Sequence, residues 1–258
     1  MLDISVIMVM RVSLILLFCS GGFLLIRMLQ TRLYNLFGLV MFFILYPITI
    51  LFSVYFDNIF SLMLINTYYP FLALFVKNTF YKEDKKFFLS LLIFIIGLRI
   101  YEFCIRLIFH FESLLFPPTD AFSAIFFYSV ILITYLQPIL AFSWLMIASL
   151  TTYKNLKGKN IKPWIKTRYL MITISSFIFL LEVINAIIIR IRQAYMDVFS
   201  IYFSVLVISL FSITNLIAWI FPKLFQRSKQ IDAEEISEKE ILMRIKEELS
   251  RKESNGNN

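Results

Sequence analysis

The chain has 258 residues, of which 60% are hydrophobic and 16% charged, and its formal net charge is +8. A soluble domain is nearer half apolar and a quarter charged, so this composition excludes an ordinary soluble domain and indicates an integral membrane protein. The apolar runs are continuous rather than alternating, which favours spanning helices over a β-barrel. The positive charge lies mainly in short links and the tail, where it sets topology, so no nucleic-acid partner is expected.

Seven apolar runs approach or exceed the length of about 20 helical residues that crosses a bilayer. In chain order they cover residues 4–26, 33–56, 59–76, 87–109, 121–150, 169–189 and 198–221. Pro47, Pro70 and Pro138 are expected to kink or bend the second, third and fifth of these helices. The sequence therefore predicts an all-α integral membrane protein, with a bundle of seven transmembrane helices over residues 1–222.

The charges of the links predict the orientation of this bundle. Lysine and arginine gather in residues 27–32, 77–86, 154–168 and 223–229, which lie on one side if there are seven spans. The acidic residues of the other side are Asp3, Asp57, Glu112 and Asp120, and its basic exceptions are Arg190 and Arg192. The positive-inside rule then places the N-terminus outside and the C-terminus in the cytoplasm.

The tail, residues 223–258, differs from the rest of the chain. Within it, residues 231–252 read IDAEEISEKEILMRIKEELSRK, with acidic residues at the start and basic residues at the end. This pattern predicts a cytoplasmic amphipathic helix, followed by a disordered end. The helix could lie on the membrane or on the inner face of the bundle, or it could dock a protein partner, and the sequence leaves these alternatives open.

A stripe of charged residues marks the fourth span. Arg99, Glu102 and Arg106 are spaced by three and four residues, which places them on one helical face, and His110 extends the stripe. Charges at membrane depth are costly and need partners. We expect Arg106 to pair with Glu102 within the helix, and Arg99 to pair with Glu182 of the sixth span, which lies at a similar depth.

Further polar side chains fall at a comparable depth in other spans. They are Asn66, Tyr135, Gln137 and Asn185. Such groups often only hold helices together, and this structural interpretation stays open beside that of a ligand or ion site facing outward. Cys19 and Cys104 fall inside apolar runs and are expected to be small buried hydrophobes rather than a disulfide or metal ligands.

The sequence contains no motif for metal binding, for a phosphate loop or for a metalloprotease, so we expect no catalytic residue, no metal, no cofactor and no enzymatic activity. In topology alone, the chain resembles heptahelical receptors. We therefore interpret it as a multi-pass cell-membrane protein, receptor-like and active in signal transduction, from a bacterium or archaeon. It would bind a small molecule in an outward-facing polar pocket and signal to a cytoplasmic protein through residues 231–252. The alternatives are a small transporter or channel that uses the midplane Arg/Glu cluster, and a membrane scaffold whose polar cluster is purely structural.

Overall fold

The computed structural model describes residues 4–55, 64, 66–81, 86–109, 118–157, 163–191, 199 and 202–219, all within the compact unit Met1–Trp219. In these ranges all regular structure is helical. The helices are α1 (Ile4–Thr31), the short 3-10 helix η1 (Tyr34–Leu36), α2 (Phe37–Tyr55), α4 (Tyr68–Phe80), α5 (Lys86–Phe109), α6 (Ala121–Leu156), α7 (Pro163–Ile191) and a further helix over Tyr202–Trp219. The predicted tail helix 231–252 and His110 lie outside the described residues.

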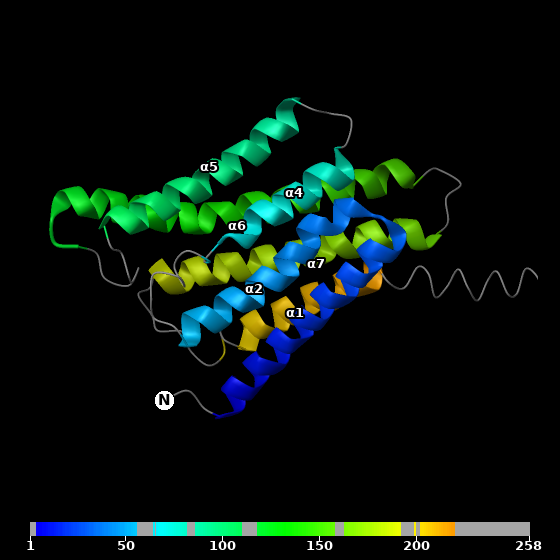
Figure 1. The fold of residues 1–258 in the computed structure, drawn as a ribbon, viewed down its shortest axis with the longest axis horizontal. Helices are drawn as coiled ribbons and strands as arrows, with labels where there is room; N and C mark the ends of the chain where they lie inside the picture. The colour runs from blue at the N-terminus through cyan, green and yellow to red at the C-terminus, as the bar shows by residue number, and fades with distance from the viewer. Residues whose placement is uncertain are drawn as a thin grey trace, which may run out of the picture. The chain divides into compact units, whose positions relative to one another are not determined.

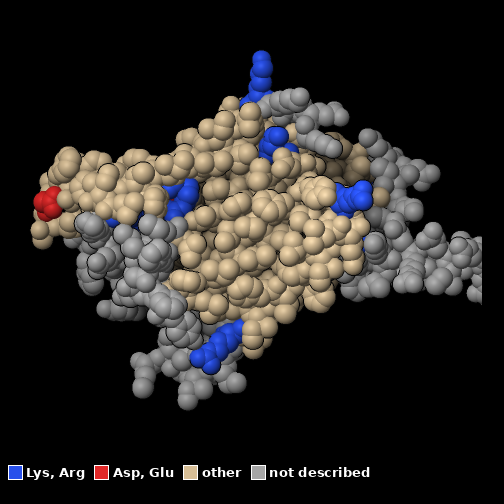
Figure 2. Space-filling view, in the orientation of Figure 1, with Lys and Arg blue, Asp and Glu red and all other residues tan. Residues whose placement is uncertain are grey.

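Six of the helical segments are long and apolar enough to cross a membrane: Arg11–Thr31, Tyr34–Phe52, Lys86–Phe109, Ala121–Leu156, Ile165–Arg190 and Tyr202–Trp219. Large apolar side chains such as Val12, Ile93, Ile125 and Phe177 are exposed on their flanks. Figure 2 shows one face of the molecule, where a few scattered charged side chains, most of them basic, interrupt an uncharged surface. A surface of this kind belongs in lipid rather than in water. The chain is therefore a helical multi-pass membrane protein whose apolar helices contact the bilayer, as predicted.

The helices run back and forth along a common direction (Figure 1). α1 and the Tyr202–Trp219 helix run the same way, α2 returns, and α4 runs against both α2 and α5. α6 and α7 share the most extensive contact, whereas α5 packs against α4 and α6 and is the least buried of the six candidate spans. α5 is thus a peripheral helix, with one face on the bundle and the other on lipid.

Aromatic rings fill the centre of the bundle. Phe142 of α6 stacks on Phe179 of α7 with ring centroids 3.9 Å apart. Phe42 of α2 meets Phe211 of the Tyr202–Trp219 helix edge to face at 5.7 Å. Because lipid tails are as apolar as these rings, it is their close packing rather than their transfer out of water that holds the helices together. Each such pair stabilises the bundle by about 0.5–1.5 kcal/mol.

The prediction of one continuous third span over residues 59–76 is wrong. Asn66 has a φ of 62°, which is left-handed backbone that an α-helix cannot contain. The helix α4 begins only at Tyr68 and continues past the predicted end to Phe80. Pro70 therefore lies in the first turn of α4, where its missing N–H costs no helical hydrogen bond, and it marks the start of the helix rather than a kink. Residues 59–63 and 65 lie outside the described residues.

Most of the other helices extend beyond the predicted runs, but α2 begins at Phe37 rather than at residue 33, because the 3-10 helix η1 precedes it. α6 continues from the predicted start at Ala121 to Leu156, and α7 begins at Pro163 rather than at residue 169. The predicted end of α6 was too early and the predicted start of α7 was too late, because polar residues continue these helices beyond their apolar cores. Pro47 and Pro138 lie inside the continuous helices α2 and α6.

The two cysteines are free and exposed, so the expectation that they are buried is wrong. Cys19 lies on α1 and Cys104 on the peripheral helix α5. In a membrane, an apolar run need not be buried inside the protein, because lipid solvates its outer face equally well.

An N-cap fixes the start of α6, directly before the candidate span Ala121–Leu156. The Asp120 carboxylate accepts a hydrogen bond from the backbone N–H of Ser123 at 2.7 Å. Hydrogen bonds from the side chain and then the backbone of Ser123 lower the pKa of this carboxyl. Since the folded pKa lies below the unfolded one, the cap stabilises the helix above the ordinary carboxyl range and is lost as the pH falls through the lowered folded pKa.

We expect Asp120→Ala to reduce the hydrogen-exchange protection of the first α6 amides at neutral pH, because no cap remains. Asp120→Asn should change protection much less, since asparagine caps as well as aspartate. As the pH falls through the lowered pKa, protection in the wild type should approach that of Asp120→Ala, while Asp120→Asn should show no such step. An asparagine variant that behaves like the alanine variant at neutral pH would contradict the capping role.

Candidate functional site

Glu102 of α5 is the centre of a buried polar cluster. Its side chain is fully buried, with 0% exposed. Oε1 accepts hydrogen bonds from Arg106 Nη2 at 2.9 Å and from Arg106 Nε at 3.2 Å. Arg99 Nη1 lies 3.5 Å from Oε2. The predicted pairing of Arg106 with Glu102 is confirmed, and Arg99 joins the same carboxylate from the turn before it.

Two other elements reach the same carboxylate. Asn66, just before α4, directs Nδ2 at both oxygens, at 3.1 and 3.2 Å. From α6, Gln137 Nε2 donates to Oε2 at 2.7 Å, and the Thr134 hydroxyl lies 3.0 Å from Oε1. One carboxylate therefore ties together α5, α6 and the segment that leads into α4.

Two threonines complete the cluster, and the sequence analysis did not single them out. Arg99 Nε donates to Thr67 Oγ1 at 3.3 Å, at the N-cap position of α4. Thr134 also accepts from Arg106 Nη2 at 3.3 Å. Their positions in the sequence could have identified them. Thr67 follows Asn66 directly, and Thr134 lies one turn before Gln137 on the same face of α6.

The cluster is closed and packed. Asn66, Arg99, Glu102, Arg106 and Gln137 are all buried. Polar groups in such surroundings are stable only when hydrogen-bonded, and most of these atoms are. Gln137 Oε1 is an exception, since this buried acceptor has no hydrogen-bond partner among the described residues. The network thus holds a carboxylate almost completely surrounded by donors, with one acceptor unsatisfied.

The predicted pair between Arg99 and Glu182 is wrong. Both ion pairs among the described residues involve Glu102. Glu182 of α7 instead accepts a hydrogen bond from Ser204 Oγ at 2.6 Å. Although Arg99 and Glu182 have similar depths, α5 packs against α4 and α6, while α7 packs against α6. The estimated depth along the membrane normal therefore placed Arg99 and Glu182 at similar levels but identified the wrong partner for Arg99.

The remaining predicted residues belong to the surroundings of Glu182. Asn185 lies one turn further along α7, and its buried Nδ2 has no hydrogen-bond partner among the residues that the structure describes. Tyr135 of α6 is half-buried and lies within electrostatic range of Arg190 and Glu182. Five of the predicted residues, Asn66, Arg99, Glu102, Arg106 and Gln137, thus share one cluster, whereas Glu182, Asn185 and Tyr135 do not contact it through any described hydrogen bond.

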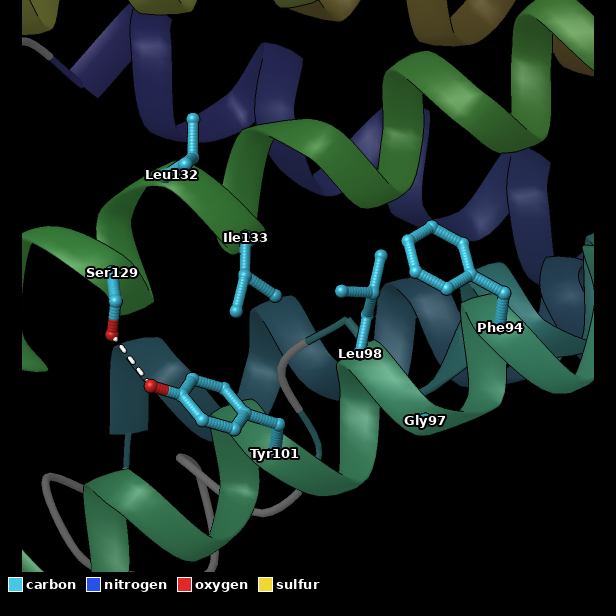
Figure 3. A pocket seen from close by; sticks show the side chains of 7 residues that line it. All are labelled: Phe94, Gly97, Leu98, Tyr101, Ser129, Leu132 and Ile133. Carbon is cyan, nitrogen blue, oxygen red and sulfur yellow. Dashed lines mark hydrogen bonds between the residues drawn. The ribbon is translucent and has the colours of Figure 1, made fainter.

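An apolar groove lies on the outside of the contact between α5 and α6 (Figure 3). It has a volume of about 320 Å³ and is lined by Phe94, Gly97, Leu98, Tyr101, Ser129, Leu132 and Ile133. Its polar feature is a hydrogen bond of 3.1 Å between the hydroxyls of Tyr101 and Ser129. Neither Glu102 nor Gln137 lines this groove, so it is distinct from the polar cluster.

The described residues contain no group of three or more His, Cys, Asp or Glu side chains that could hold a metal ion. Comparisons of the chain with family models, curated proteins and solved structures find no match. The class that the fold defines is a multi-pass helical membrane protein, and the chemistry of its candidate site is that of a buried carboxylate held by guanidinium, amide and hydroxyl donors.

Proposed function

We propose that this chain is a non-enzymatic sensor or receptor-like protein, and that the Glu102 cluster is the element that changes state. The observation that carries the proposal is the break before α4. The left-handed residue Asn66 interrupts the third apolar run at the point where its side chain binds Glu102. Backbone in this conformation persists where the surroundings fix it, and such positions concentrate at ligand sites and switches.

The proposal includes seven spans. α4 has 13 residues and a length of about 20 Å, which is shorter than the bilayer core of about 30 Å. It nevertheless runs against both of its neighbours in the chain, α2 and α5. Together with residues before it, α4 would supply the third crossing, and the N- and C-termini would then lie on opposite sides of the membrane.

The orientation we propose has the N-terminus outside. Described basic residues such as Arg27, Lys77 and Lys154 lie near the ends of α1, α4 and α6, which the positive-inside rule assigns to the cytoplasm. Residues 1–222 would form the membrane domain. Residues 223–258 would be cytoplasmic, with 231–252 contacting a protein partner.

The geometry supports a mechanism for signalling. A small molecule that enters from the outer side and competes for Glu102 or its donors would release Asn66. The start of α4 could then shift against α2 and α6, and the other end of α4 lies at the proposed cytoplasmic side. The unsatisfied Oε1 of Gln137 favours this role over a purely structural one, because a structural network is expected to satisfy every member.

Hydrogen exchange on the full chain in lipid nanodiscs tests this proposal. Glu102→Gln should increase exchange at the amides of the first two turns of α4 by about ten-fold or more beyond any increase elsewhere in the bundle, if the release removes about 1.4 kcal/mol of local stability. Glu182→Gln is the matched control, because it neutralises a membrane carboxylate outside the cluster and should leave α4 unchanged. Exchange that rises throughout the bundle with no additional increase at the start of α4 would instead make the cluster a purely structural link, as in a scaffold.

A transporter or channel is the second candidate, because interrupted helices at membrane depth also form substrate and ion sites in transporters. Proteoliposome measurements of proton and ion flux separate the two functions. Flux through the wild type that disappears in Glu102→Gln would establish transport. A sensor should show no flux in either protein.

A further inference from the structure

Three helix ends meet at the basic end of the bundle, away from the Glu102 cluster. The hydroxyls of Ser20 on α1 and Ser212 on the Tyr202–Trp219 helix lie 2.6 Å apart. Because these two helices run in the same direction (Figure 1), residues that lie about two turns beyond each serine share one level. Those residues are Arg27 and Trp219.

Arg168, near the start of α7, joins them. Its guanidinium lies over the Trp219 ring, 4.7 Å from the ring centre. Arg168 is also within electrostatic range of Arg27, and both side chains are half-buried.

Hydrogen-bond donors without acceptors mark the same place. Trp219 is 5% exposed, and its buried indole Nε1 has no hydrogen-bond partner within the described part of the chain. The buried Nε of Arg27 likewise has none. Buried donors in native proteins are normally paired, so each of these needs an acceptor. Clustered donors beside two positive charges are the complement of an oxyanion.

We propose that Arg27, Arg168 and Trp219 form a binding site for a phosphate group, supplied by an anionic phospholipid headgroup at this end of the bundle or by free phosphate. Guanidinium groups match phosphate with paired N–H donors, and tryptophan favours the headgroup level of a membrane. Basic pockets between transmembrane helices bind anionic headgroups in the same way. The proposal depends on the membrane fold and not on a sensor function.

Binding to the full-length protein in neutral detergent tests the site, with native mass spectrometry as the readout. The probes are phosphatidylglycerol, phosphatidylcholine and inorganic phosphate. The wild type should retain phosphatidylglycerol in preference to phosphatidylcholine. Arg27→Gln with Arg168→Gln should weaken this binding by about a hundred-fold, since each lost charged hydrogen bond contributes about ten-fold. The control, Lys86→Gln with Lys157→Gln, removes two exposed charges and should change binding less than about two-fold.

A second variant keeps the test valid if the double arginine variant does not fold. Trp219→Phe retains the aromatic ring but removes the N–H donor, and it should weaken phosphatidylglycerol binding by about five-fold, the value of one hydrogen bond. Inorganic phosphate that competes with the lipid would identify free phosphate as a ligand, whereas binding of lipid alone would identify a headgroup site. Equal retention of phosphatidylglycerol by the wild type, the arginine variant and Trp219→Phe would overturn the proposal.

Discussion

Glu102→Gln should lower the free energy of unfolding by about 3–5 kcal/mol, because it removes the negative partner of a buried pair. The variant leaves two guanidinium groups beside a neutral amide, within a cluster from which water is excluded. Unfolding in mixed micelles, followed by circular dichroism, measures the change. Glu182→Gln is again the control, and it should cost only about 1 kcal/mol, since Ser204 supplies a single hydrogen bond.

A double-mutant cycle identifies the cause of this loss. If the unbalanced charge of Arg106 is responsible, the double variant Glu102→Gln/Arg106→Gln should lose less free energy of unfolding than the two single variants lose in sum. The difference, which is the coupling energy, should be about 0.5–3 kcal/mol. The hydrogen bonds of 2.9 and 3.2 Å between the two side chains predict this coupling. Strictly additive losses would show that Glu102 acts through its other partners, Asn66, Gln137, Thr134 and Arg99.

The sequence predicted the cluster within α5 but not the neighbours of every member. Spacings of three and four residues placed Arg99, Glu102 and Arg106 on one face, because the helix repeat alone determines that. The depth estimate gave Asn66 and Gln137 the correct level. It could not distinguish them from Glu182, since depth says nothing about which helices are adjacent. That information lies in the packing of α5 between α4 and α6.

The fold, like the cluster, could be predicted from the sequence only in part. Apolar content predicted a helical membrane protein, because the length and hydropathy of each run are readable from the sequence. The interruption before α4 was not predicted, because hydropathy records side chains and not backbone angles. Asn66 looked like one more polar residue in an apolar run. Its left-handed conformation becomes understandable only with Glu102 in place beside it.

A second large loss of stability is expected from a substitution at the contact between α2 and α4. Gly38 is buried at the start of α2, and a Cβ added there would overlap the carbonyl oxygen of Phe71 and lie 2.7 Å from the backbone N of Phe75. These are backbone atoms of α4, so relief requires the whole helix to move. Gly38→Ala should therefore lower the free energy of unfolding by about 1–3 kcal/mol or more. Small residues permit this close approach between membrane helices.

Gly22→Ala is the matched control for Gly38→Ala, since a Cβ at Gly22 would meet nothing within 4 Å. Alanine there should leave stability unchanged or raise it by up to about 1 kcal/mol, because glycine is the weaker helix former. Since α4 begins beside Asn66, its displacement in Gly38→Ala should also loosen the contact between Asn66 and Glu102. Hydrogen exchange should then increase in the first turns of α4 as well as in α2. If Gly38→Ala lowers the free energy of unfolding no more than Gly22→Ala does, the close approach of α2 and α4 at Gly38 is contradicted.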